Sequence, residues 1–227
     1  MEEYIGYDLV VEEIPERSRV LDLGCGDGTL LFLLQENKGV NGCGVEISEE
    51  GVSRCLEKGV YSYQADIDEG LSDYRDNSFD YVILNQTIQN TKRPDLVLKE
   101  VLRIGKKVIV SFPNFGYYRI RLFLLFKGRM PVSKLLPYEW YNSPNIHLLT
   151  IKDMKRMEKE FSFKILQQQH FSLVGEGKNK IFNFIKKIVC GCNPHTNKSK
   201  SCKVRIMPNL FAQYGFFVIT SKKDTNQ

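Results

Sequence analysis

The chain has 227 residues, of which 42% are hydrophobic and 26% charged, as is typical of a globular protein that buries a substantial core. No apolar run approaches the roughly 20 residues that span a bilayer, so stable membrane insertion is not expected. The formal net charge of +5 is local: residues 178–205 hold eight Lys or Arg and no acid, and the rest of the chain holds 24 basic and 27 acidic residues. We therefore predict no nucleic-acid partner.

The cysteines and the first residues both favour a reducing compartment. The first four residues include two glutamates and lack the apolar stretch of a secretory signal, so we expect a cytoplasmic protein. The six cysteines are not spaced like a disulfide scaffold and are expected to be free thiols. Cys190, Cys192, His195 and Cys202 have side chains that bind zinc, but their spacing is not that of a standard site, and no metal is predicted.

Apolar runs and helical patterns alternate along most of the chain. In chain order we expect a helix at 4–13, a strand at 19–23, a helix at 29–35, a strand at 40–47, a helix at 49–57, strands at 60–64 and 79–84, a helix at 94–102, a strand at 107–112, a helix at 151–160, and strands at 163–169 and 216–220. Ser48 and Thr150 are expected N-caps, because a hydroxyl oxygen accepts a hydrogen bond from a free amide of the first turn. This alternation predicts an α/β fold with a doubly wound, mostly parallel sheet.

Two insertions interrupt this pattern in what we treat as a single domain, residues 1–227. Residues 113–149 follow the fifth strand and are rich in aromatics and arginines. Ligands of open α/β sheets bind at the carboxyl ends of strands, so this insertion is predicted to form a lid or a partner surface. A packed helical insertion without a direct role is the alternative. Residues 178–205 are predicted to form a basic loop near the C-terminus.

Three glycines follow the first predicted strand at alternating positions, and this is the strongest motif of the chain. Gly24, Gly26 and Gly28 precede a helix start and let the backbone approach a ligand. The dinucleotide fingerprint has a different spacing, and its pyrophosphate would be repelled by an internal acid. Asp22 and Asp27 suit the cationic sulfonium and ammonium of S-adenosylmethionine better. The loop therefore favours S-adenosylmethionine, or its product S-adenosylhomocysteine, over NAD.

Further candidate cofactor residues follow the next three strands. Glu46, with Ile47, lies about 20 residues beyond the first glycine, where an acid accepts from ribose hydroxyls. Asp66, with Ile67, is predicted to accept from the adenine amine, and Asp68 competes for this role. The alternatives are a solvated surface glutamate and a loop acid in an Asx-turn. Asn85 and Gln86, with Thr87, are predicted to face the methionine part of the cofactor.

The sequence provides no evident general base. Asn85, Gln86 and Thr87 are neutral at physiological pH and can orient a ligand without taking its proton. His147 is the one histidine candidate near the predicted site, and a structural role is its alternative. With Tyr117 and Arg119 it forms a weak set of catalytic candidates.

Taken together, these residues resemble the MetW family of methionine-biosynthesis proteins, within the class I S-adenosylmethionine-dependent methyltransferases. The matching segments are 19–31, 44–48, 64–68, 78–84 with Gln86 and Thr87, 111–117, 128–131, 136–141, 144–147 and 208–211. The resemblance implies a Rossmann-like fold and a cytoplasmic protein that acts beside a homoserine O-acyltransferase, and it implies no firm methyl acceptor. The basic insertion 178–205 looks longer than in the family.

Two hypotheses of function follow, with a third that is weaker. The first is a MetW-like protein that binds S-adenosylmethionine, supports a homoserine O-acyltransferase by association, and in one version also transfers a methyl group. The second is a methyltransferase acting on a small, anionic molecule. Methyl transfer from a sulfonium can be accelerated by positioning alone, so a missing base does not exclude it. The third is an NAD-binding oxidoreductase.

Overall fold

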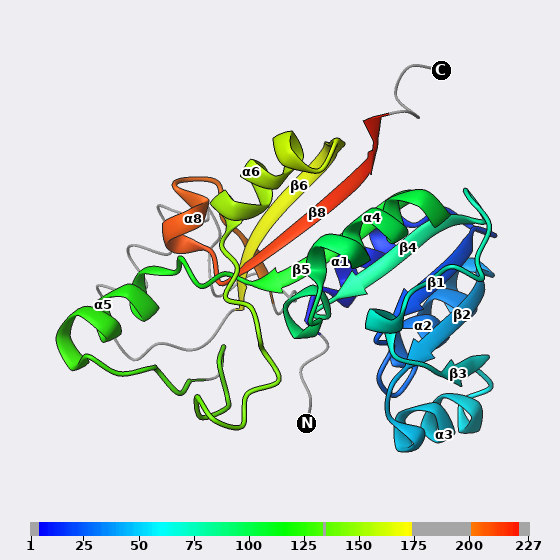
Figure 1. Ribbon diagram of the computed structural model, residues 1–227, viewed down its shortest axis with the longest axis horizontal. Helices are drawn as coiled ribbons and strands as arrows, with labels where there is room; N and C mark the ends of the chain where they lie inside the picture. The colour runs from blue at the N-terminus through cyan, green and yellow to red at the C-terminus, as the bar shows by residue number, and fades with distance from the viewer. Residues whose placement is uncertain (1–4, 134, 174–200, 223–227) are drawn as a thin grey trace.

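The computed structural model describes residues 5–133, 135–173 and 201–222, and these form one eight-stranded sheet with helices on both faces (Figure 1). The strand order is β3-β2-β1-β4-β5-β8-β6-β7. The strands are β1 Arg19–Leu23, β2 Asn41–Glu46, β3 Ser62–Gln64, β4 Phe79–Asn85, β5 Gly105–Pro113, β6 Phe163–Leu173, β7 Ser201–Lys203 and β8 Tyr214–Ser221. The pairings among β1 to β5 are parallel, and those of β6, β7 and β8 are antiparallel. The predicted doubly wound, mostly parallel α/β fold is confirmed.

The sheet separates two hydrophobic cores, and helices cover one core on each of its faces. The helices are α1 Tyr7–Glu13, α2 Thr29–Lys38, α3 Glu49–Glu57, α4 Pro94–Ile104, α5 Tyr118–Lys127, α6 Ile151–Glu160 and α8 Pro208–Phe211, with 3-10 turns η1 Ile67–Glu69 and η2 Ile88–Asn90. Side chains of α4 and α6 pack in one core, and those of α1, α2, α3 and α5 in the other. Successive residues of β1 point to opposite faces, so Leu21 and Leu23 join the first core and Val20 the second.

Most predicted elements are present, and the differences have local causes. The first helix begins at Tyr7 and not at residue 4, because Gly6 precedes it in the left-handed conformation (φ 77°). The strand predicted at 163–169 continues to Leu173, where it pairs with β8 and β7. Ser48 and Thr150 are N-caps as predicted, accepting from the amides of Gly51 and Asp153.

The short elements η1, η2, β7 and α8 were not predicted, and neither was helix α5. Residues 201–203 of the predicted basic loop form β7, whereas 174–200, with Cys190, Cys192 and His195, lie outside the described residues. Cys25, Cys43, Cys55 and Cys202 are free thiols. Among the helices that the structure describes, none is long and apolar enough to cross a membrane.

The insertion at 113–149 leaves the end of β5, and we call it the lid segment. Its helix α5 projects from the body at the end opposite α3 (Figure 1). Ile120 is the buried residue of α5. The segment returns along the sheet edge, where the amide of Phe115 donates to the Leu149 carbonyl (3.0 Å) before the chain enters α6. It is therefore fastened at its two ends, with α5 between them.

Candidate functional site

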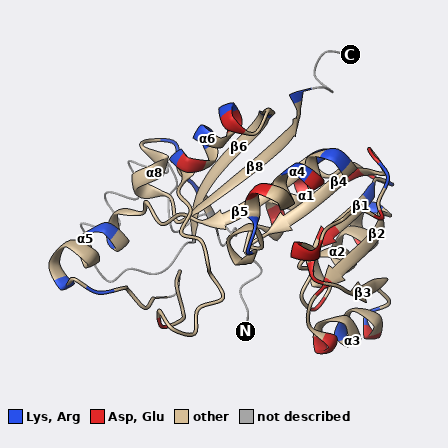
Figure 2. Cartoon of the chain, viewed as in Figure 1, with Lys and Arg blue, Asp and Glu red and all other residues tan. Residues whose placement is uncertain are grey.

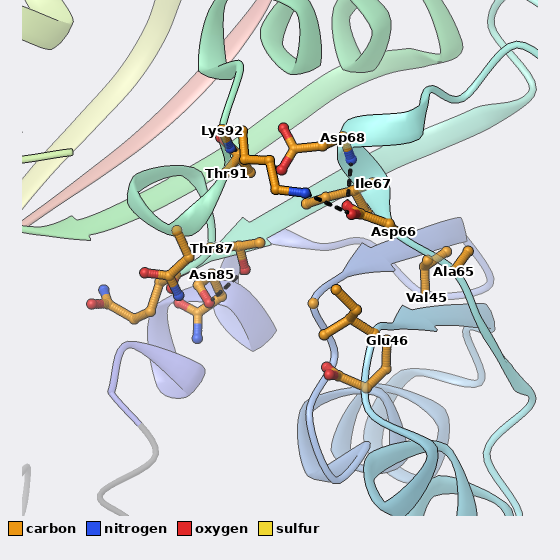
Figure 3. Close-up of a pocket in the computed structure, with 14 residues that line it drawn as sticks. Val45, Glu46, Ala65, Asp66, Ile67, Asp68, Asn85, Thr87, Thr91 and Lys92 are labelled. Carbon is orange, nitrogen blue, oxygen red and sulfur yellow. Dashed lines mark hydrogen bonds and ion pairs between the residues drawn. The ribbon is translucent and has the colours of Figure 1, made fainter. Parts of the chain in front are cut away.

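A cavity of about 260 Å³ opens at the carboxyl ends of β1, β2, β3 and β4 (Figure 3). Parallel strands bring their carboxyl ends to one edge, so residues far apart in sequence meet there. The lining residues are Gly24, Val45, Glu46, Ile47, Ala65, Asp66, Ile67, Asp68, Asn85, Gln86, Thr87, Asn90, Thr91 and Lys92. Three carboxylates and one ammonium group thus lie among apolar and neutral polar residues.

The glycine loop forms the wall of this cavity nearest to β1. The amides of Gly24 and Cys25 donate to the Val45 carbonyl (2.8 and 3.2 Å), which fixes the turn against β2. Gly24 has φ 75°, and a Cβ there would lie 2.8 Å from atoms of the Thr87 side chain. Only glycine fits without displacing Thr87, which itself lines the cavity.

Glu46 is held at the cavity edge by the loop that it faces. Its Oε2 accepts from the amide of Gly26 (2.8 Å) and its Oε1 from the amide of Ser48 (3.0 Å). Two amide donors fix the carboxylate, and each oxygen still has a lone pair for a further donor. Gly51, on the first turn of α3, allows this arrangement, since a Cβ there would lie 2.7 Å from Cγ of Glu46 and 2.9 Å from the Gly26 carbonyl oxygen.

Two aspartates at the opposite wall have different partners. Asp66 accepts from the amide of Asp68 (2.9 Å), the Asx-type contact that begins η1, and its other oxygen lies 3.4 Å from Nζ of Lys92. Asp68 accepts from the amides of Lys92 and Arg93 (2.8 and 2.9 Å) just before α4. Asp68 therefore has two backbone donors that hold it to the link before α4. The Lys92 side chain is mostly exposed, so its contact with Asp66 is the more easily opened of the two.

Asp22 lies near the cavity without lining it. It is buried in β1, and burial, with a smaller contribution from the negative charge of Glu46, raises its pKa to about 7. The sequence placed this acid among the cofactor residues. Asp22 is linked to the cavity through the electrostatic repulsion between its ionised carboxylate and that of Glu46.

Asp27 and Gly28 do not line the cavity, and they hold the start of α2. Asp27 accepts from the amide and hydroxyl of Thr29 (3.1 and 2.8 Å) and pairs with Nζ of Lys58 (2.5 Å). Partial burial opposes ionisation of Asp27, but the hydrogen bonds from Lys58 and Thr29 outweigh it and lower the pKa. Gly28 is the N-cap of α2, and a Cβ there would lie 2.8 Å from Sγ of Cys55. Together with Asp22 and Gly26, these are the predicted cofactor residues that do not line the cavity.

A polar network supports the cavity at the end of β4. The Ser111 hydroxyl, fully buried on β5, donates to Oδ1 of Asn85 (2.5 Å) and accepts from Nε2 of Gln86 (3.0 Å). Nδ2 of Asn85 donates to the Ile5 carbonyl (3.3 Å), so the residues before α1 close this side. Gln86 has φ 59°, a conformation that is strained for a residue with a side chain and is frequent at ligand sites.

The three weak catalytic candidates are not brought together at the cavity. Tyr117 is buried, with its ring against Tyr118, and Arg119 is exposed on α5. His147 lies nearer: its amide donates to the Gln89 carbonyl (2.9 Å), and its Nε2 is 3.4 Å from the Lys92 carbonyl oxygen. None of the three lines the cavity among the residues described.

The link between β4 and α4, residues 86–92, touches both the cavity and the lid segment. Gln86, Thr87, Asn90, Thr91 and Lys92 of this link line the cavity. The carbonyl of Gln89, between them, accepts from the amides of both Ile146 and His147 in the lid segment (2.9 Å each). Residues 90–92 were not predicted as site residues, because no motif marks them and only the turn of η2 brings them to the cavity.

Comparison with known proteins identifies relatives of two kinds. The sequence model of a family described as methionine biosynthesis protein MetW matches residues 5–191. A bifunctional methionine biosynthesis protein MetXA/MetW of Rhodopirellula baltica is 33% identical over 178 residues, which are 74% of this chain and 28% of that protein. The chain thus spans little more than a quarter of that relative's length. A demethylmenaquinone methyltransferase of Staphylococcus aureus is 27% identical over 172 residues, covering 68% of this chain and 71% of that enzyme.

Solved structures support the fold independently of sequence. A SAM-dependent methyltransferase of Thermotoga maritima, described as a possible histamine N-methyltransferase, superposes with a TM-score of 0.62 at 18% identity. The match covers 95% of this chain and 87% of that structure. The protein PH0226 of Pyrococcus horikoshii gives a TM-score of 0.59 at 22% identity, covering 96% and 88% of the two chains. The fold is that of the Rossmann-like methyltransferases.

Proposed function

The chain belongs to the MetW family of methionine biosynthesis proteins, and we propose that it binds S-adenosylmethionine and supports a homoserine O-acyltransferase by association. The observation that carries the first part is the set of acids around the cavity. Glu46 ends β2 and Asp66 follows the neighbouring strand β3, and Gly24 leaves the cavity open between them and β4. Carboxylates suit the hydroxyls of a ribose and the cationic groups of S-adenosylmethionine, and they would repel a pyrophosphate.

Each candidate cofactor residue has a role in this proposal. Glu46, positioned by two amides, accepts from the ribose hydroxyls, with Ile47 beside the adenine. Asp66 accepts from the adenine amine once Lys92 moves aside, and Ile67 packs on the ring. Asn85 and Gln86 orient the methionine end. Gly26, Asp27 and Gly28 shape the loop, and Asp22 lies buried in β1, the strand that leads into it.

The acyltransferase partner is supported by the relative from Rhodopirellula baltica, whose name joins MetXA and MetW in one protein. A fusion keeps two units at high effective concentration, as an association between separate chains would do more weakly. We take its other part as the acyltransferase that the sequence resemblance implies. The link 86–92 would carry the state of the cavity to the lid segment, because Gln89 bonds to Ile146 and His147.

Methyl transfer to a small anionic molecule is the second candidate. The methyl group would pass from the sulfonium to the acceptor, leaving S-adenosylhomocysteine, with no base required for an acceptor that is already nucleophilic. The likeness to a demethylmenaquinone methyltransferase favours it. His147, which contacts the cavity link, would lie nearer to an acceptor than Arg119, which is exposed on α5.

Cofactor binding is tested by titrating the protein with S-adenosylmethionine and with NAD in a calorimeter. We expect saturable binding of the first only. Glu46→Gln should weaken it at least tenfold, since an amide cannot accept from both Gly26 and Ser48 and from a ribose. Glu50→Gln is the matched control, because Glu50 lies on α3 and pairs at the surface with Arg54. Equal affinity in wild type and Glu46→Gln would contradict the proposed site.

The Asp66 and Asp68 variants separate the two candidates for the adenine contact. Asp66→Asn should weaken binding several-fold with little effect on stability. Asp68→Asn should instead destabilise the link before α4, because Asp68 holds two of its amides. The opposite pattern would assign the contact to Asp68.

Association is tested by co-purification with the homoserine acyltransferase of the same organism, with and without S-adenosylmethionine. Acyl transfer and release of labelled methyl groups are assayed in the same samples. We expect a complex that raises acyl transfer and whose strength changes with the cofactor. Methyl transfer without any complex would favour the methyltransferase candidate.

A further inference from the structure

The helix α5 has an unusual distribution of apolar side chains for a helix at the surface. Residues 122–126 are five consecutive apolar residues, so they point to every side of the helix. Leu125 and Phe126 are 73% and 75% exposed, and Leu122 and Leu124 are exposed as well. A helix that is apolar on all sides is normally buried. Among the described residues of α5, only Ile120 is buried.

The charges around α5 are all of one sign. Figure 2 shows blue and no red on this helix, which carries Arg119, Arg121 and Lys127, with Arg129 just after it. No acidic residue occurs between positions 114 and 138. A surface that covers α5 therefore needs apolar side chains at its centre and acidic ones at its rim.

From these two features we propose that α5 inserts into an apolar groove with an acidic rim on the homoserine acyltransferase. The inference rests on the proposed association and adds to it the surface involved. A groove covers more than one side of a helix, which suits the distribution of Leu122 to Phe126. The position of α5, projecting from the body at one end of the molecule, leaves it accessible to such a groove (Figure 1).

Charge and shape disfavour the other occupants. Residues 178–205 of this chain are apolar in part, but their eight basic residues and absence of acids would repel the basic surface of α5. A symmetric contact between two copies of α5 would bring the same positive charges together. An anionic membrane would suit the positive charge of α5. A helix that lies in a membrane surface, however, needs one polar face toward water, and the apolar side chains of residues 122–126 occupy every side of α5.

The experiment measures binding of the full chain to the immobilised acyltransferase. Leu125→Ser and Phe126→Ser should each weaken binding at least tenfold, and Lys127→Glu about three- to tenfold, with less effect at high salt. Leu56→Ser is the matched control, because Leu56 is 56% exposed on α3 at the other end of the molecule, and it should bind as wild type. Circular dichroism melts confirm that every variant is folded.

The outcomes distinguish the α5 surface from the association with the acyltransferase, and both from the other occupants of α5. Wild-type binding that Leu125→Ser and Phe126→Ser leave unchanged would overturn the α5 surface and leave the association standing. Absence of wild-type binding would overturn both. Sedimentation with vesicles of phosphatidylcholine and phosphatidylglycerol, lost in Phe126→Ser, would assign α5 to a lipid surface. A dimer in size-exclusion chromatography, lost in the same variant, would assign it to a second copy.

Discussion

In the glycine loop and around β2 the charged side chains have partners within the chain, whereas α5 of the lid segment presents four large apolar side chains to solvent. Asp27 pairs with Lys58, and Glu46 accepts from two backbone amides. Leu122, Leu124, Leu125 and Phe126 have no such cover. The first region is held together by contacts within the chain, while the second leaves apolar side chains exposed. In the function that we propose, the first region binds a small molecule and the second a partner.

The largest change in stability is expected on substitution of Asp22, the buried acid of the strand that leads into the glycine loop. Asp22→Asn should raise the free energy of unfolding above pH 7 by up to about 4 kcal/mol, at 1.4 kcal/mol for each pKa unit. The folded pKa of about 7 lies above the unfolded value of 3.8, so wild type loses stability as pH rises between these values, and the asparagine does not. Urea unfolding at several pH values measures the difference between the two proteins.

The test compares the free energy of unfolding of wild type with that of Asp22→Asn at each pH, because a second group also changes the stability of both proteins in the same pH range. Burial lowers the pKa of His170 on β6 to about 4. Below about pH 6.5 the imidazole is protonated in the unfolded chain but not in the folded one, so the free energy of unfolding decreases as pH falls. In wild type the two slopes oppose each other between pH 4 and 6.5. Asp22→Asn should show stability that rises with pH across that interval. A constant difference between the two proteins at all pH values would show that Asp22 is not held neutral by burial.

The next largest effect compares two glycines of the same loop. Gly24→Ala should lower the free energy of unfolding by about 3 kcal/mol, from left-handed strain and from overlap with Thr87. Gly26→Ala is the control: its φ is 58° and a Cβ there meets nothing within 4 Å, so about 1 kcal/mol is expected. Equal losses in the two variants would mean that strain, and not the close approach to Thr87, governs the loop.

A smaller effect tests whether the ion pair behind the loop stabilises it. Lys58→Met should cost about 1 to 2 kcal/mol, because Asp27 would keep Thr29 but lose its charged donor. Arg54→Met on the same helix removes an exposed pair with Glu50 and should change stability by less than about 0.5 kcal/mol. Chemical denaturation of both variants gives the comparison, and a larger loss for Arg54→Met would reverse our assignment.

The smallest effect is expected in the lid segment. Trp140 is 75% exposed, and its ring contacts Tyr141 edge to face. Trp140→Ser should shift the free energy of unfolding by less than about 0.5 kcal/mol, as at other exposed positions. A loss of several kcal/mol would show that Trp140 contributes to the core and would weaken the contrast between the two regions.

The sequence predicted the region of the cavity better than the lid segment, for physical reasons. Strands β4 and β5 contain apolar runs, and Ser48 caps α3 through a contact within three residues, so local patterns suffice. Helix α5 was not predicted, since residues 122–126 have no helical periodicity to reveal it. The ion pair of Asp27 with Lys58 joins residues 31 positions apart, and Lys92 reaches the cavity only through the path of η2. Such contacts depend on the folded chain as a whole.

The fit of Gly51 against Glu46 and Gly26 has a consequence for protein engineering. The turn of α3, the end of β2 and the glycine loop leave no room for a methyl group between them, so they form one interlocking part. A graft of this loop onto another scaffold, or a redesign toward a different nucleotide, must move all three positions together. Random mutagenesis that samples them one at a time would discard the combinations in which a larger residue at 51 is matched by a shorter one at 46.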